Sequence, residues 1–374
     1  MEIIIEIAKF VLRAIYAIFK LFKTRNKITF LSRQSNTPSI DFMLLEQELK
    51  SRSKDTKFVM LTKRIESGIK AKIGYAFHIF EQMYHVATSR IVILDGYQIV
   101  ISVLNHKKDL KVVQLWHALG SLKKFGYSIM DKGEGSKSSI IHKMNMHKNY
   151  DIVLSSSKIA KNNFAEAFNM KKNKVVVMGL PRIDFLQSDK YRKMTIDKIF
   201  KQYPSLDNGK KQIVYVPTFR KNAQDGVRVE DIVSRVDYTK YNLIVKLHHD
   251  KELVYTDNKE NVVFGNIATG MEFLHIADYV ITDYSAITFE ALIAGKPVYY
   301  YVYDYENYKN ARDMYIDFKD EMPGVISENP DEILQAIQND VRFEKKTEEF
   351  IKKYVSTCEK NNTAELAKYI LKMM

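Results

Sequence analysis

The sequence has very little cysteine and lacks the usual fingerprints of metal and nucleotide sites. Cys358 is the one cysteine among 374 residues, which excludes an intramolecular disulfide and a multi-cysteine zinc site and fits a reducing cytoplasm. No cluster with zinc-ligand spacing, Asp-x-Asp element, P-loop or Rossmann glycine fingerprint occurs. The residues therefore predict neither a cofactor nor a bound metal ion.

The sequence also lacks internal repeats and low-complexity tracts. Hydrophobic residues make up 46% of the chain and aromatic residues 12%, which excludes a disordered tail protein. The length suits two domains, because single cores stop growing at roughly 250–300 residues. The net charge of +13 indicates an anionic partner, which could be nucleic acid, anionic lipid or a phosphate-bearing substrate.

Residues 1–26 are predicted to form an amphipathic helix that associates with a membrane. Residues 3–22 are mostly apolar, but at about 100° per residue the charged side chains fall on one stripe. The stripe comprises Glu2, Glu6, Lys9, Arg13, Lys20 and Lys23. This pattern favours a helix lying in the interface of an anionic membrane over a membrane span or a signal peptide. The alternative is a helix docked on the protein's own core.

Short apolar runs rich in β-branched residues alternate with helix-length gaps along the rest of the chain. The expected strands are 27–31, 57–61, 91–94, 111–116, 152–155 and 175–178, and then 212–216, 243–247, 262–264, 279–282 and 298–302. This rhythm is typical of βαβ units and parallel sheets, so we expect an α/β protein. A break near residue 180 predicts domains at 27–180 and 181–355, and a C-terminal helix at 356–374 could cross back onto the first domain.

A histidine follows the strand that ends in Trp116. His117 is followed by a glycine turn with Gly120 and Ser121, and a histidine with a pKa near neutrality can accept a proton from an attacking hydroxyl. Asp95, at the end of another strand, could orient an acceptor hydroxyl or the imidazole of His117. Ligands collect at the carboxyl ends of strands in open α/β sheets, so this is a candidate catalytic site. The alternative is a histidine with a structural hydrogen bond only.

A second candidate site follows a strand of the second domain. Lys246 and His248 point to the same side of that strand and could together grip a phosphate. The sequence does not separate His248 from the adjacent His249. The alternative is a pair of histidines satisfied by the backbone at a strand end.

The segment after the strand 279–282 is predicted to open a helix at 286–294. Thr282 and Ser285 bring hydroxyl groups to the helix start, where the helix dipole favours a phosphate. Glu290 lies about one and a half turns in, where a carboxylate could receive two sugar hydroxyls. In the alternative, Asp283 or Ser285 simply caps the first turn.

Two arginines complete the set of candidate substrate ligands. Arg182 follows Gly179-Leu180-Pro181, and Arg220 follows Thr218-Phe219 at a strand end. A guanidinium group after a turn suits bidentate contact with a phosphate.

Five ordered motifs resemble the CDP-glycerol glycerophosphotransferases of wall teichoic acid synthesis. They are residues 114–126, 179–182, 215–220, 246–248 and 281–285, and the segment 296–304 is similar as well. The resemblance implies a GT-B fold, in which two Rossmann-like domains face a central cleft, and metal-independent transfer of glycerol phosphate from CDP-glycerol. It also implies that His117 is the base, that His248 is a phosphate ligand and that Asp283-Tyr284-Ser285 receives the donor's phosphates.

The resemblance also predicts the subtype, the acceptor and the location. Polymerases of this family usually carry a large extra N-terminal region, whereas only a short helix precedes the first domain here, so the chain resembles the primase. The primase adds the first glycerol phosphate to undecaprenyl-diphosphate-linked ManNAc-GlcNAc, releases CMP and works as a peripheral protein at the cytoplasmic face of the membrane. Neither a cofactor nor a nucleic-acid partner is expected, and no oligomeric state is predicted.

Two alternatives remain open at this point. The first is a glycerol- or ribitol-phosphate polymerase of teichoic acid or capsule synthesis, which uses the same chemistry. The second, from another class, is a non-catalytic basic protein that binds a membrane or nucleic acid, with salt-sensitive binding and no turnover of CDP-glycerol.

Overall fold

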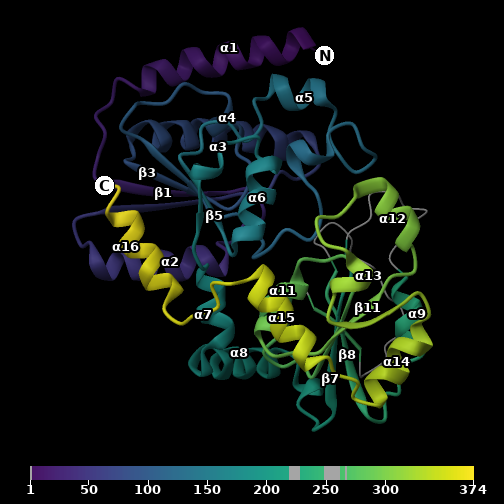
Figure 1. The fold of residues 1–374 in the computed structure, drawn as a ribbon. Helices are drawn as coiled ribbons and strands as arrows, with labels where there is room; N and C mark the ends of the chain where they lie inside the picture. The colour runs from purple at the N-terminus through teal and green to yellow at the C-terminus, as the bar shows by residue number, and fades with distance from the viewer. Residues whose placement is uncertain (1, 219–227, 248–261, 266–267) are drawn as a thin grey trace. The chain divides into compact units, whose positions relative to one another are not determined.

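The structure is a computed structural model that describes residues 2–218, 228–247, 262–265 and 268–374. The chain forms two compact units, both of α/β construction (Figure 1). The first unit contains the residues up to Leu119, Lys124–Arg182 and Glu359–Met374. The second contains Gly120–Lys123 and Ile183–Cys358.

The first unit is built on a six-stranded parallel sheet in the order β2-β1-β3-β4-β5-β6. Its strands are β1 (Lys27–Ser32), β2 (Lys57–Thr62), β3 (Ile91–Leu94), β4 (Lys111–Gln114), β5 (Ile152–Ser155) and β6 (Val175–Val177). Its helices are α1 (Glu2–Phe19), α2 (Ile40–Arg52), α3 (Ile69–Thr88), α4 (Ile99–Ser102), α5 (Ser138–Lys143), α6 (Lys158–Ala167) and α16 (Asn362–Leu371), with 3-10 turns at Gly126–Ile129 and Lys172–Lys174. The central strands β1 and β3 are buried along their whole length, as expected for a parallel sheet covered on both faces.

The second unit repeats this construction with the strand order β12-β11-β10-β7-β8-β9. Its strands are β7 (Lys211–Val216), β8 (Tyr241–Val245), β9 (Val262–Phe264), β10 (Tyr279–Thr282), β11 (Val298–Tyr301) and β12 (Gly324–Ser327). Its described helices are α8 (Asp189–Gln202), α9 (Val229–Val233), α10 (Gly270–Phe273), α11 (Ile287–Ile293), α12 (Tyr305–Arg312), α13 (Phe318–Glu321), α14 (Pro330–Gln338) and α15 (Glu344–Tyr354), with a 3-10 turn at Pro204–Leu206. The helix α7 (Pro181–Gln187) begins where the chain leaves the first unit.

The predicted α/β fold class, with two parallel sheets and an N-terminal helix, is confirmed. Each expected strand is present within two residues at either end. The strand β12 was not expected, because it begins at a glycine and contains only two large apolar residues, Val325 and Ile326. It pairs only with β11, at the edge of the second sheet.

The helix α1 has two apolar faces, one packed on the first unit and one exposed. Tyr16 is buried, its hydroxyl oxygen lies 2.9 Å from Nδ1 of His106, and Leu12 and Phe19 pack against the same core. On the opposite face Phe10 is 73% exposed, together with Ile3, Ile7, Val11 and Ile18. The helix is therefore docked on the protein's core and still presents apolar side chains outward. Among the described residues no helix is long and apolar enough to cross a membrane.

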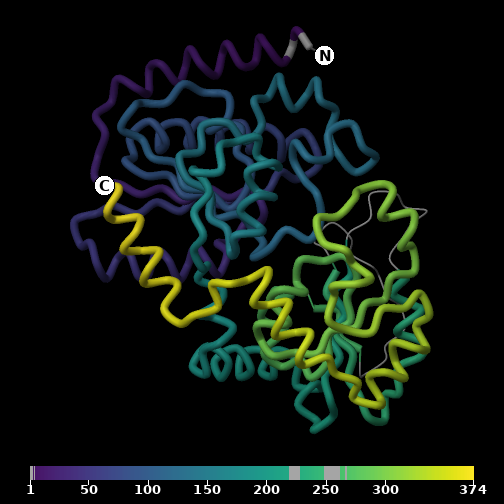
Figure 2. The backbone as a smooth tube through the Cα atoms, viewed as in Figure 1, coloured from purple at the N-terminus to yellow at the C-terminus, as the bar shows by residue number. Residues whose placement is uncertain are grey.

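The last helix returns to the first unit. The helix α16 lies beside α2, so the two ends of the chain belong to one unit (Figure 2). Leu366, Ala367 and Ile370 of α16 are fully buried. Residues far apart in sequence therefore share one core.

We expect Leu366→Ala to destabilise the first unit by about 2–5 kcal/mol, because it removes a fully buried side chain and leaves a cavity. The free energy of unfolding in urea measures this loss. The control on the same helix is Lys368→Ala, whose exposed side chain forms only an i,i+3 pair with Glu365, and we expect it to cost less than about 1 kcal/mol. Equal effects of the two substitutions would show that α16 does not pack as described.

Candidate active site

The turn that carries His117 is held by side chains of the first unit. Trp116 has φ 65°, in the left-handed region that non-glycine residues rarely adopt. Gln114 stabilises this turn, since its Oε1 accepts from the amide of Trp116 and its Nε2 donates to the carbonyl of Gly96, both at 2.9 Å. The indole ring stacks on Phe125, with ring centroids 4.8 Å apart. Such local strain persists only where the surroundings enforce it, so the direction of the next residue is fixed.

The imidazole of His117 is oriented by a main-chain carbonyl. Its Nδ1 lies 3.0 Å from the carbonyl oxygen of Asp95, and the amide nitrogen of Gln34 is farther away, at 3.5 Å. A carbonyl oxygen only accepts, so the shorter contact requires a proton on Nδ1 and leaves the basic lone pair of the neutral ring on Nε2. The side chain of His117 is exposed. This arrangement suits a general base that acts through Nε2.

Asp95 contributes its backbone, rather than its carboxyl group, to the orientation of His117. Its side chain is buried, and Oδ1 has no hydrogen-bond partner in the described part of the chain. Burial raises the pKa of this carboxyl to about 7. The residue whose carbonyl holds the imidazole therefore also carries a carboxyl group that changes charge near neutral pH, and the predicted contact of that carboxyl with an acceptor hydroxyl stays a prediction.

Arg182 forms a buried ion pair with Asp41 of α2, with exposed fractions of 5% and 2%. The carboxylate accepts from the backbone amide and from Nε of Arg182, both at 2.8 Å. Nη1 of Arg182 donates to the carbonyl of His117 at 3.0 Å. Arg182 was expected to contact a phosphate, but in the structure its guanidinium is buried and engaged inside the unit. It holds the main chain of His117.

In the second unit, Asp283 ties the ends of two neighbouring strands together. Its carboxylate accepts from the amide of Thr218 at 2.8 and 3.0 Å and from the hydroxyl of Thr218 at 2.6 Å. Thr282 donates its hydroxyl to the carbonyl of Val216 at 2.6 Å. Both Thr282 and Asp283 are buried, so the expected use of the Thr282 hydroxyl for a phosphate is replaced by a bond that joins β10 to β7.

The helix after β10 is shorter than predicted. It covers Ile287–Ile293, and Ala286 stands at the N-cap without a side-chain hydrogen bond. The carboxylate of Asp283, which could have capped the first turn, bonds Thr218. Ser285 is half-buried and accepts from the amide of Ile287 at 3.4 Å, so its hydroxyl lies at the helix start. Glu290 is buried inside α11.

Lys246 follows β8 and turns toward a neighbouring loop. Its ammonium group donates to the carbonyl of Gly265 at 2.6 Å, and burial lowers its pKa. A Cβ atom added to Gly270 would lie 3.6–3.9 Å from Ile287, Val216 and Lys246, so the carboxyl ends of β7 and β8 and the start of α11 meet at this glycine. An ammonium group carries three donors, so the bond to Gly265 does not exclude the predicted phosphate contact, which stays a prediction. The predicted ligands His248 and Arg220 lie outside the described residues.

Gly120 and Ser121 continue the His117 motif into the second unit. A Cβ atom on Gly120 would lie 2.4 Å from the ring of Phe289 on α11, so only glycine fits there. Ser121 is buried as well. Close packing on α11 thus explains this glycine without a ligand.

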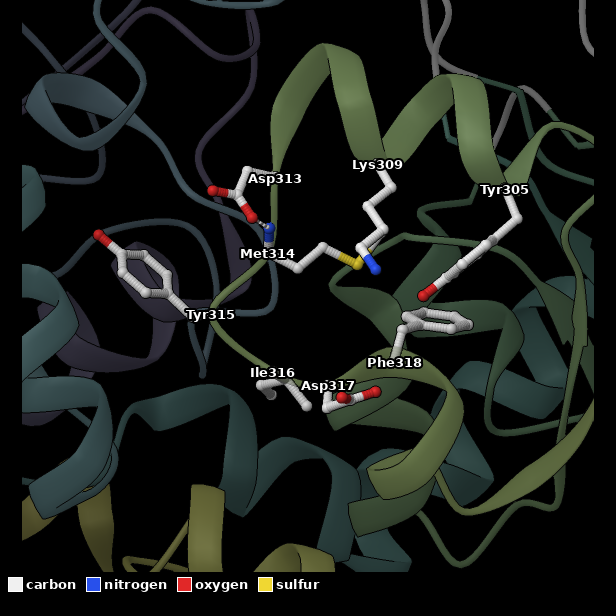
Figure 3. Close-up of a pocket in the computed structure, with 8 residues that line it drawn as sticks. All are labelled: Tyr305, Lys309, Asp313, Met314, Tyr315, Ile316, Asp317 and Phe318. Carbon is white, nitrogen blue, oxygen red and sulfur yellow. Dashed lines mark hydrogen bonds between the residues drawn. The ribbon is translucent and has the colours of Figure 1, made fainter.

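A cavity of about 240 Å³ lies in the second unit between α12 and α13 (Figure 3). Its lining comprises Tyr305, Lys309, Asp313, Met314, Tyr315, Ile316, Asp317 and Phe318. The wall formed by Met314 and Tyr315 contacts the segment that follows His117. The amide of Tyr315 donates to the carbonyl of Leu122 at 3.0 Å, and Lys123 and Met314 form an isolated antiparallel β-bridge. None of the residues predicted to bind the substrate lines this cavity, so the cavity gives no support to their predicted roles. In the described ranges no three His, Cys, Asp or Glu side chains are grouped as metal ligands would be.

Comparison with known proteins assigns the family. The model of the CDP-Glycerol:Poly(glycerophosphate) glycerophosphotransferase family matches residues 14–372, so the chain belongs to this family of transferases, which act in teichoic acid synthesis. A teichoic acid ribitol-phosphate primase of Bacillus spizizenii is 29% identical over 354 residues, which cover 92% of this chain and 90% of that protein. A teichoic acid glycerol-phosphate primase of Bacillus subtilis is 29% identical over 276 residues, or 72% and 70% of the two chains.

The same fold occurs in a solved structure. The wall teichoic acid polymerase TagF, in a crystal soaked with CDPG, matches with a TM-score of 0.80 and 16% identity over 99% of this chain and 97% of that one. The comparison supports the GT-B class for the two α/β units.

We expect Asp41→Asn to lower the free energy of unfolding by about 3–5 kcal/mol, because it leaves the guanidinium of Arg182 buried without its counter-charge. We also expect kcat to fall by roughly tenfold or more, with a smaller change in KM for the donor, since the loss displaces the His117 carbonyl. The matched control is Glu48→Gln on the same helix, which breaks only the half-exposed pair with Arg52. A stable, fully active Asp41→Asn enzyme would contradict the positioning role.

The pKa of Asp95 predicts a pH-dependent stability. Because its folded-state pKa of about 7 lies above the unfolded value of about 4, the folded protein holds this proton more tightly, and stability is lost as the pH rises between those values. A difference of one between the folded-state and unfolded-state pKa corresponds to about 1.4 kcal/mol in the free energy of unfolding. We expect Asp95→Asn to remove this dependence in urea unfolding at about pH 5 and pH 8, whereas the exposed-site control Asp55→Asn keeps it. Parallel pH curves for the wild type and Asp95→Asn would contradict this assignment.

Proposed function

We propose that the protein is a teichoic acid primase that transfers glycerol phosphate from CDP-glycerol to an undecaprenyl-diphosphate-linked ManNAc-GlcNAc disaccharide and releases CMP. Family membership and the similarity to primases along most of both chains support this proposal. The observation that carries it is the fixed imidazole of His117, whose Nδ1 is bound to the Asp95 carbonyl and whose Nε2 is the basic nitrogen.

The proposed reaction is an attack of a sugar hydroxyl on the β-phosphorus of the donor. His117 accepts the hydroxyl proton at Nε2 while the new P–O bond forms. The bond between the β-phosphorus and the oxygen that bridges to the α-phosphate breaks, and CMP leaves with that oxygen. Arg182 and Asp41 keep the His117 backbone in place during this step.

The second unit is proposed to bind the donor through the carboxyl ends of its strands. Ser285, His248 and Lys246 are the proposed phosphate ligands, and Lys246 has donors besides the one that bonds the Gly265 carbonyl. Charge on the phosphoryl oxygens would be stabilised by such donors. Asp283 and Thr218 support this segment by fixing the strand ends.

A ribitol donor is the second candidate. A ribitol-phosphate primase of Bacillus spizizenii is aligned along 92% of this chain and 90% of its own length, so CDP-ribitol is the alternative donor. A polymerase that adds many units uses the same chemistry and differs in the length of the product.

We also propose that the protein works as a peripheral protein at the cytoplasmic face of the membrane, where the acceptor's lipid is embedded. The exposed apolar face of α1 supports this placement, because apolar side chains on the outside of a surface helix suit an anionic lipid interface.

The test is an incubation of the purified protein with CDP-glycerol or CDP-ribitol and the lipid-linked disaccharide, with CMP release and product mass as readouts. A primase gives a single addition and a polymerase gives many, and the donor that is consumed identifies the alditol. His117→Ala should lower the rate by roughly a hundredfold or more, as expected for loss of a general base. The exposed histidine of α5 provides the control, and His142→Ala should retain the wild-type rate.

Three outcomes would contradict the proposal. No CMP release with either donor would support the non-catalytic alternative, and repeated additions would support a polymerase. A folded His117→Ala variant with a near-normal rate would reject the assignment of the base.

A further inference from the structure

A second helix of the first unit exposes apolar side chains. Ile69, Ile73, Phe77 and Phe80 lie on one face of α3 at spacings of four and three residues. Ile69 is 79% exposed, Phe77 is 70% exposed, and Ile65 in the preceding loop is exposed as well. A surface helix ordinarily turns its apolar stripe to the core and its polar face outward, so this face of α3 requires a partner.

The opposite face of α3 packs on the first unit's core, so the exposed apolar residues of α3 are not needed to form that core. Met83, Val86 and Ala87 are buried in the first unit's core, and Ile79 packs against it. Tyr84 of α3 also meets the end of α1, with ring centroids 6.0 Å from Phe19 and 5.7 Å from Phe22. The two helices that expose apolar faces are therefore neighbours in one unit.

The start of α3 lies at the end of the sheet where the strands finish, and His117 lies at the same end. Because the strands are parallel, the loop from β2 into α3 and the turn after β4 both follow carboxyl ends of strands at the same end of the sheet. Lys63 joins the end of β1 to α3, because its amide donates to the carbonyl of Ser32 at 3.1 Å and its ammonium donates to the carbonyl of Gly74 in α3 at 3.2 Å. The first turns of α3 are thus fixed to the end of β1, at the same end of the parallel sheet as the candidate catalytic residue.

The charges around the start of α3 identify the partner. Between residues 63 and 72 there are four basic side chains, Lys63, Arg64, Lys70 and Lys72, against one acidic side chain, Glu66. Lys70 and Lys72 are exposed next to the apolar stripe. Apolar side chains flanked by lysine are the signature of a helix in the interface of an anionic bilayer, where each basic residue near the surface adds to the attraction.

We propose that the exposed face of α3 is a second membrane-docking surface, which acts together with α1 and brings the His117 edge of the first unit to an anionic bilayer. The proposal deepens the proposed function and rests on it for its purpose, since a lipid-linked acceptor is presented from that bilayer. The α1 helix alone would tether the unit, whereas a second contact at the start of α3 also orients the sheet edge toward the lipid.

The test compares the wild type with an Ile73→Glu/Phe77→Glu variant of the full chain in co-sedimentation with phosphatidylcholine vesicles, with and without phosphatidylglycerol. We expect the affinity of the double variant for the anionic vesicles to fall by a factor on the order of ten or more, because two charges replace apolar groups in the interface. Phe10→Glu on α1 should weaken binding as well. The matched control is Met43→Glu on α2, an exposed apolar residue of the same unit, which should bind as the wild type does.

Activity assays separate this inference from the proposed function. The double variant should lose turnover of the lipid-linked acceptor in vesicles but keep the wild-type rate with a water-soluble disaccharide acceptor. Wild-type vesicle binding by the double variant would overturn the inference. A lower oligomeric mass of that variant in light scattering without vesicles would also overturn it, because the stripe would then bind a second copy of the chain. Absence of turnover with both acceptors in a wild-type protein that binds vesicles would reject the proposed function alone.

Discussion

A buried ion pair between Arg182 and Asp41 determines the geometry of the first unit's site. Removing two charges from water costs several kcal/mol per ion, and only excellent geometry offsets that cost. Here the Asp41 carboxylate accepts from both the backbone and the side chain of Arg182, and the guanidinium has a further bond to the His117 carbonyl. One interaction thus joins α2, the turn after β4 and the start of α7. The strained Trp116 turn and the Asp95 carbonyl then fix the ring of His117 itself.

Much of the fold could be predicted from the sequence because its signals are local. Short β-branched runs separated by helix-length gaps give parallel strands, and each expected strand is present. The strand β12 has no such signal, since its pairing with β11 depends on a sheet edge that only the folded chain provides. The sequence also could not show that one apolar face of α1 packs on the core while another is exposed. Hydrophobic periodicity shows that a face is apolar but not what covers it.

The candidate site could be predicted in its position but not in its contacts. Strand-end motifs indicated where His117, Thr218 and Asp283 would lie, and Thr218 and Asp283 do meet in the structure. The sequence shows which side chains can donate, but it does not show what they donate to. Arg182 and Lys246 both bind protein groups, because a buried cation needs polar partners. Asp41 lies 141 residues from Arg182 and resembles an ordinary acidic residue in the first turn of a helix, so no local pattern could have identified it.

The return of α16 to the first unit affects how the protein is made. A ribosome delivers the first unit's sheet early, but the helix that covers α2 emerges only after the whole second unit has been synthesised. Until then, the surface of α2 that later packs against α16 is not covered by it. The first core of the nascent protein therefore stays incomplete throughout the synthesis of the second unit.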